Sequence, residues 1–141
     1  MIDAITDADL VVLPPSNPVV SVGTILGVPR VREALRATKA HVVGLSPIVG
    51  GTHVRGMAHQ MLTSIGVEVS AAAVGLHYGW RADADGTGIL DGWLIDERDA
   101  DQVAAVQATG LACAAVALMM TDPEATAAMA AAAIGLVVGT A

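Results

Sequence analysis

The chain has 141 residues, of which 54% are hydrophobic and only 15% charged, and its formal net charge is −7. This composition excludes a disordered segment, which needs low hydrophobicity, and the shortage of cations excludes a nucleic-acid-binding face. The single cysteine excludes a disulfide framework and a zinc site built from several cysteines. So few charges cover a single 141-residue domain thinly. We therefore expect a partner subunit, a second copy or a missing part of the same protein to cover apolar surface.

Two strand–helix units are predicted in the first part of the chain. The apolar run 10–13, ended by two prolines, predicts a buried strand of a parallel sheet. A loop over 14–18 then precedes one or two helical turns over 19–26. A helix over 29–38 begins with a proline, which suits a first turn. The β-branched run 40–45 predicts the second strand, which a Ser-Pro pair and two glycines end.

The middle of the chain carries one clear helical face. Val54, Met57, Met61 and Ile65 recur at helical spacing, and the following Gly66 suits a helix end. The segment 69–76 fits a helix or a strand. A polar loop over 81–88 separates it from a predicted strand over 93–95.

Helix capping signals organise the last third. Asp99 and Gln102 form a capping pair for a helix that Gly110 ends, and the run 111–120 predicts a buried strand. Thr121 and Glu124 form a second capping box, which opens a helix over the Ala-rich end of the chain.

Neither end of the chain predicts export or membrane insertion. The start carries an acid, Asp3, where a signal peptide carries basic residues. The apolar run 125–141 is mostly alanine and glycine, which contribute little to insertion, so we expect a buried helix there. We therefore expect a cytoplasmic protein with no membrane partner.

Strands that alternate with helices predict a three-layer α/β fold with a mostly parallel, Rossmann-like sheet. Ligands bind such sheets at the carboxyl ends of the strands. Two predicted strands end in unusual loops, at 14–18 and 46–51. The candidate site is expected there.

The first loop holds its polar side chains on a backbone fixed by three prolines. Ser16 and Asn17 are therefore presented at low entropic cost, with Pro18 behind them. The unpaired amides of a helix starting near Ser21 would attract phosphate, and the Asn17 amide suits a base or ribose edge. The alternative is an ordinary rigid turn in which Ser16 and Asn17 cap the next helix.

The second loop, 46–51, is a candidate ligand contact for similar reasons. Gly50 and Gly51 permit close backbone approach or positive φ, and Arg55 could pair with a phosphate. The alternative is a solvated helix start. Ser46 does not form a nucleophile elbow, because proline follows it and the second glycine is missing.

Other motifs predict no metal or nucleophile. His53 and His59 lie about 240° apart around a helix, so one face cannot present both to a metal. The acidic run 83–91 resembles part of a calcium loop, but Leu94 stands where a glutamate is required. Cys113 falls in a predicted buried strand, where a thiol is inert. There is no glycine-rich phosphate loop of the Walker or Rossmann kind.

A family resemblance begins at the two loops. The stretch 8–26, with its Pro-Ser-Asn-Pro string, and the stretch 45–51 resemble the 2-phospho-L-lactate transferase family, most closely its actinobacterial branch. The match continues through Tyr78, 90–96 and 118–120. Arg55 stands where the family pattern has lysine, and Met57 where it has proline.

The resemblance implies that residues 1–141 form a single α/β unit corresponding to the C-terminal portion of a longer protein, and hence an incomplete domain. It places the glycine-rich nucleotide loop and the aspartates that bind Mg²⁺ in the absent N-terminal portion. Asp91 and Asp96 match the family, but spacing gives no reason to place them at the site. We assign no catalytic base and no metal ligand within the chain.

The implied activity is transfer of a phospholactyl or phosphoenolpyruvyl group from a guanosine diphosphate-linked donor to the deazaflavin Fo, with release of GMP, in the biosynthesis of coenzyme F-420. Ser16, Asn17 and Ser21 would contact the donor nucleotide, and Ser46, Gly50 and Gly51 would form a second wall of the same cleft. Two alternatives stay open: a non-enzymatic nucleotide or nucleotide-sugar binding module of the same superfamily, and a fragment that serves only as an interaction surface. We expect the chain alone to be inactive, and either a homo-oligomer or the N-terminal portion to cover its apolar surface.

Overall fold

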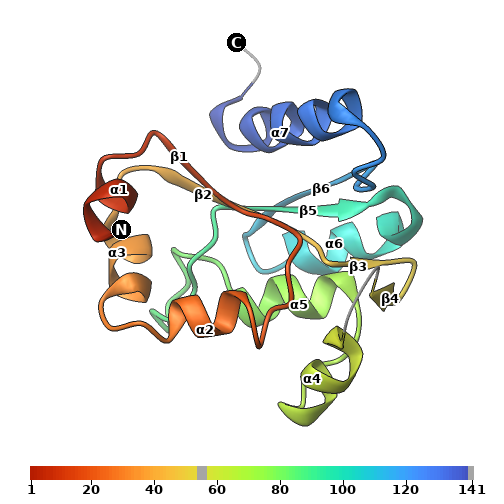
Figure 1. Cartoon of the computed structure of the whole chain (residues 1–141), viewed down its shortest axis with the longest axis horizontal. Coiled ribbons are helices and arrows are strands. Elements are labelled where there is room, and N and C mark those ends of the chain that lie inside the picture. Colours follow the sequence, from red (N-terminus) through yellow and green to blue (C-terminus); the bar gives the residue numbers. More distant parts are fainter. Residues whose placement is uncertain (54–56, 140–141) are drawn as a thin grey trace.

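A computed structural model describes residues 1–53 and 57–139. Its centre is a parallel sheet of four strands in the order β1-β2-β5-β6 (Figure 1). The strands are β1 (Leu10–Leu13), β2 (His41–Leu45), β5 (Gly92–Asp96) and β6 (Ala112–Val116). Helices cover both faces, so the predicted three-layer α/β fold is confirmed.

The two faces of the sheet are covered unequally. One face carries the single long helix α7 (Pro123–Val138), and the shorter helices pack on the other (Figure 1). The shorter elements are α1 (Ile2–Thr6), α2 (Val22–Leu26), α3 (Val31–Ala37), α4 (Ala58–Ser64), α5 (Ala71–Tyr78), the 3-10 turn η1 (Glu97–Gln102) and α6 (Val103–Gln107). A small antiparallel hairpin, β3 (Ile48–Val49) and β4 (Thr52–His53), follows β2.

The core is centred on Trp93 of β5, which is fully buried on the face of the shorter helices. Its indole Nε1 donates to the Ala71 carbonyl at 3.0 Å. Gly44 of β2 and Gly75 of α5 make room for the ring, since a Cβ on either would lie within 2.7 Å of it. Tyr78, one of the residues that carry the family resemblance, packs edge-on against the same indole. It is therefore a core residue.

Both capping predictions in the last third were wrong in detail. Asp96, not Asp99, caps the helical segment after β5, by accepting a hydrogen bond from the Arg98 amide. Asp122, not Thr121, caps α7, by accepting from the Ala125 amide. The pattern located each helix start to within a few residues, but several acceptors compete for each cap.

Helix positions were predicted better than helix faces. The segment 69–76, left open between helix and strand, forms α5 behind a Ser70 cap. The predicted face of α4 was wrong: Met57 and Ile65 are exposed, and Ala58 and Leu62 are buried instead. Of the other two members of that face, Met61 is half-buried and Val54 lies outside the described residues.

Two boundaries and the burial of the last helix also differ from the prediction. The proline at 29 precedes α3 rather than starting it, and the strand predicted over 111–120 ends at Val116. The helix at the end of the chain is only partly buried, with Met129 and Ala133 as its buried residues. None of the described helices is long and apolar enough to cross a membrane. The pattern predicted neither α1 nor the β3–β4 hairpin.

Candidate functional site

The two loops singled out in the sequence meet at one cavity. Because β1 and β2 are adjacent and parallel, their carboxyl ends lie at the same edge of the sheet. A cavity of about 370 Å³ opens between the loops that follow these strands. Its lining residues are Pro15, Asn17, Ser46, Pro47, Val49, Ala58, Leu118, Met119 and Met120.

Asn17 caps the chain that follows it and still presents a donor. Its Oδ1 accepts hydrogen bonds from the amides of Val19, at 2.9 Å, and Val20, at 3.1 Å. Both partners are N–H donors, so the oxygen must face them and the NH₂ group is left over. Within the described residues this Nδ2 has no acceptor, and Asn17 lines the cavity. Asn17 therefore fits both interpretations, the turn cap and the ligand contact.

The expected phosphate site at the start of α2 is weak. The amides of Ser21 and Val22 already donate to the Asn17 carbonyl, at 3.2 and 3.0 Å. The helix has only five residues, so its dipole is small. Pro18 is buried, and its carbonyl would lie 2.8 Å from a Cβ at Gly23. These residues hold the loop against α2 by close backbone packing.

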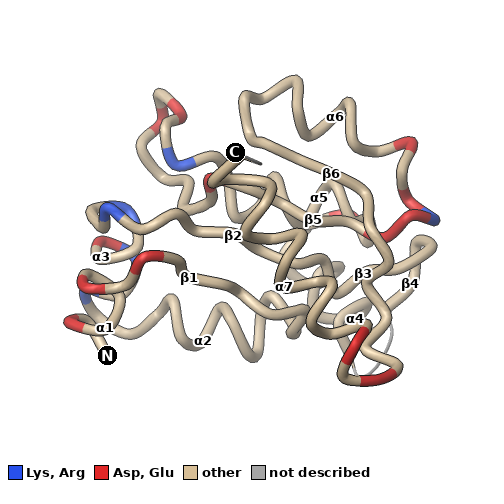
Figure 2. The backbone as a smooth tube through the Cα atoms, turned by 90° about the horizontal axis from the view of Figure 1, so that it is seen from above, with Lys and Arg blue, Asp and Glu red and all other residues tan. Residues whose placement is uncertain are grey.

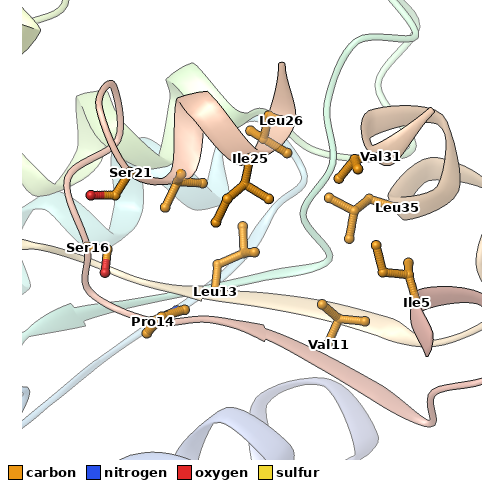
Figure 3. Close-up of a pocket in the computed structure, with 11 residues that line it drawn as sticks. Ile5, Val11, Leu13, Pro14, Ser16, Ser21, Ile25, Leu26, Val31 and Leu35 are labelled. Atoms are coloured by element: carbon orange, nitrogen blue, oxygen red, sulfur yellow. The ribbon is translucent and has the colours of Figure 1, made fainter. Parts of the chain in front are cut away.

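Ser16 and Ser21 do not line this cavity. They lie at one end of a second, largely apolar cavity of about 190 Å³ between β1, α2 and α3 (Figure 3). The structure thus separates them from Asn17 and Ser46.

Ser46 shapes its loop and is not a free nucleophile. The side chain is 1% exposed. Its hydroxyl donates to the Ile48 carbonyl at 2.9 Å and accepts from the Ile48 amide at 3.1 Å. Its own amide donates to the Leu94 carbonyl, which extends the pairing of β2 with β5.

Gly50 and Gly51 form the two-residue turn of the β3–β4 hairpin, with φ of 59° and 71°. Positive φ at both positions is typical of a hairpin turn and explains the two glycines. Their amides donate to the carboxylate of Asp99, at 2.8 and 3.2 Å. Both amides therefore point at Asp99, and neither glycine lines the cavity.

Asp96, at the end of β5, and Asp99, in η1, hold the loops around the cavity. Asp99 is 3% exposed and also accepts from Gln102 Nε2. Asp96 is 4% exposed, and its Oδ2 accepts from the amide of Leu118, a residue of the cavity wall. The sequence pattern predicts a capping role for Asp99 instead, because nothing local links it to Gly50 and Gly51, which lie 49 and 48 residues earlier.

Asp91, the other family-matched aspartate, lies at the opposite end of the sheet. Its Oδ2 accepts from the Val42 amide at the amino end of β2 and pairs with Arg81 Nη2 at 2.6 Å. The Nη1 of Arg81 donates to the carbonyls of Leu35, Thr38 and Ala40, each at 3.1 Å. This ion pair ties the end of α3 to the start of β2, far from the cavity.

The cavity is neutral in the described part of the chain. No lining residue carries a charge. No group of three or more His, Cys, Asp or Glu among the described residues could hold a metal ion. Arg55, the predicted phosphate contact, lies outside the described residues. Burial on β6 raises the pKa of the Cys113 thiol to about 11, which supports the prediction that this thiol is inert.

Comparison with known proteins identifies the family. The model for 2-phospho-L-lactate transferase CofD matches residues 1–134. The chain belongs to the CofD family. A phosphoenolpyruvate transferase of Kitasatospora aureofaciens is 55% identical over 136 residues, which cover 96% of this chain and 40% of the relative. Phosphoenolpyruvate transferases of Streptomyces griseus and Mycolicibacterium smegmatis are 57% and 54% identical, over 92% of this chain and 39% and 37% of theirs. The chain thus spans about 40% of these relatives' length, at their C-terminal part.

Proposed function

We propose that this CofD-family chain forms one wall of the active site of a cytoplasmic transferase. That enzyme moves a phosphoenolpyruvyl group from a guanosine diphosphate-linked donor to the deazaflavin Fo and releases GMP, in coenzyme F-420 biosynthesis. The relatives are phosphoenolpyruvate transferases, which favours a phosphoenolpyruvyl over a phospholactyl group. One observation carries the proposal: the two loops that hold the family's Pro-Ser-Asn-Pro and Ser-Pro-Ile strings line a single cavity.

We assign the guanine base to this cavity. Pro15, Pro47 and Met119 supply apolar walls that suit the faces of a flat ring. Asn17 Nδ2 is a donor for a carbonyl oxygen on the edge of the base. The described lining holds no cation to neutralise a phosphate. The phosphates therefore extend toward the part of the family fold that lies outside this chain.

We infer that the residues that hold Mg²⁺ lie in the portion of the family fold outside this chain. The two carboxylates that hold the loops around the cavity, Asp96 and Asp99, are buried and already accept hydrogen bonds from backbone amides. They do not fit a magnesium site, and we derive no step through the metal here. The residues of this chain bind and orient, which is the main contribution of a protein to phosphoryl-type transfer.

Titration calorimetry with guanosine and GDP tests the assignment of the base. We expect the two ligands to bind within about threefold of each other, because the base carries the contact. Asn17→Ser keeps a capping oxygen but removes the NH₂ donor, and one hydrogen bond is worth about 1 kcal/mol or somewhat more, so binding weakens about tenfold. Gln60→Ser, at an exposed position on α4, is the matched control and leaves binding unchanged.

Two results would contradict the proposal. Absence of heat with GDP at high millimolar concentration would show that the chain holds no nucleotide site. A preference for uridine nucleotides would favour the non-enzymatic binding module.

A separate assay tests whether the transfer reaction needs both this chain and the segment that it lacks. Purified chain with Fo, Mg²⁺ and the guanosine diphosphate-linked donor should give no product. Addition of the segment that the longer relatives carry and this chain lacks should restore product formation. Product from the chain alone would show that it contains the whole active site.

A further inference from the structure

The sheet has an unfinished edge at β1. Among the described strands β1 pairs only with β2, so its other side presents unpaired backbone groups. Figure 2 shows it as the outermost strand on the side of α2. Its sequence, Leu-Val-Val-Leu, is entirely apolar and has no charge or proline to discourage pairing. Strands of parallel sheets are normally buried on both faces, and β1 has the composition of such a strand.

One face of this edge is bare. Val12, at the centre of β1, is 41% exposed. It points to the side of α7, because its neighbours Val11 and Leu13 pack into the core under the shorter helices. Helix α7 packs on β2, β5 and β6, and it exposes Ile134 and Val138. A helix beside α7, above β1, would cover Val12.

The other face of β1 is incompletely filled. The cavity of about 190 Å³ lies there, between β1 and helices α2 and α3 (Figure 3). Apart from Ser16 and Ser21 its lining is apolar. Three independent features thus coincide at one edge: unpaired strand groups, an exposed valine and an apolar cavity.

We propose that this edge binds a strand–helix unit from the portion of the CofD fold that lies outside this chain. The strand pairs in parallel with β1, and the helix lies beside α7 on Val12. The relatives contain enough additional chain to form such a unit, since this chain spans only about 40% of their length. A second copy of the chain fits less well. Two-fold pairing of identical edge strands is antiparallel, and both copies would carry a net charge of −7.

The test is reconstitution in trans. The segment of the Streptomyces griseus relative that this chain does not match is co-expressed with the chain as a separate polypeptide. We expect a 1:1 complex by light scattering, with slower hydrogen exchange at the amides of β1. Val12→Lys should weaken the complex at least tenfold. Leu76→Lys, an apolar position of similar exposure on α5, is the control and should not.

A covalent fusion of the same segment to this chain gives a second measurement that does not need a soluble fragment. In the fusion β1 should be protected from exchange, and Val12→Lys should lower the thermal midpoint more than Leu76→Lys does. An unprotected β1 in the fusion, equal effects of the two lysines, or a homodimer of the chain that protects β1 would overturn the proposal. These readouts involve no nucleotide, so their failure is distinguishable from failure of the proposed function.

Discussion

The two ends of the sheet use charge in opposite ways. At the amino end, described cations gather around α3 and the neighbouring loop: Arg30, Arg32, Arg36, Lys39 and Arg81 (Figure 2). Arg81 forms an ion pair with Asp91 and donates hydrogen bonds to backbone carbonyls. At the carboxyl end the buried charges are Asp96 and Asp99, and each is satisfied mainly by backbone amides.

This contrast gives the two ends different roles: the amino end stabilises the fold, and the carboxyl end forms the cavity. The amino end is closed by the Arg81–Asp91 ion pair. The carboxyl end has carboxylates that fix loops, and a neutral cavity between those loops. No residue in the described lining of this cavity supplies the positive charge that a phosphate-bearing ligand needs, which agrees with a chain that spans part of a longer fold.

Asp91→Ala should have the largest effect. It removes the partner of Arg81 and the acceptor of the Val42 amide, and it leaves a partly buried guanidinium unpaired. Breaking such a pair costs about 3 kcal/mol of unfolding free energy. Urea unfolding measures it, with Asp83→Ala in the exposed loop as a control that should change stability by less than about 0.5 kcal/mol. Equal effects would show that the amino end does not depend on this ion pair.

Asp99→Ala tests the corresponding aspartate of the carboxyl end. The amides of Gly50 and Gly51 lose their acceptor, but both glycines are exposed and water can replace it in part. We expect a loss of about 1–2 kcal/mol. Hydrogen exchange at these two amides should accelerate, whereas the exposed neighbour Asp101→Ala should leave it unchanged. Unaltered exchange would mean that Asp99 does not hold the hairpin.

Gly50→Ala tests the backbone of the same hairpin. A side chain at φ 59° is strained, and the substitution should cost about 1 kcal/mol. Gly135→Ala is the matched control in α7, where no atom lies within 4 Å of the new Cβ. It should stabilise the chain by up to about 1 kcal/mol, because alanine favours helix. Thermal unfolding measures both, and the same sign for the two would contradict the turn geometry.

The smallest effect is the pH dependence of the amino end. Burial and the nearby Arg32 lower the pKa of His77 from its ordinary value of 6.5. The unfolded chain therefore binds a proton that the folded chain does not, so stability is full above pH 6.5 and falls as the pH drops below it. The midpoint of urea unfolding, measured between pH 5 and 8, reports this dependence. In His77→Gln the midpoint should vary less with pH. An unchanged slope would exclude His77 as its source.

Short-range patterns predicted the skeleton of this protein. The apolar runs 10–13 and 40–45 became β1 and β2, and the alternation of strands with helices gave the sheet its parallel order. Because parallel strands end at one edge, the proximity of Asn17 and Ser46 also followed from the pattern. Ser16 and Ser21 stand close to Asn17 in the sequence, and only the turn of the backbone directs them to another cavity.

The sequence by itself determined which segments become strands and at which edge of the sheet a site can form, because both depend on local periodicity and on proline and glycine. Only the tertiary structure decided what the charged residues do. Asp91 meets Arg81 across a loop, and Asp99 meets Gly50, which lies 49 residues earlier in the chain. The partner of a buried carboxylate is set by how distant segments pack, and no local spacing records that choice.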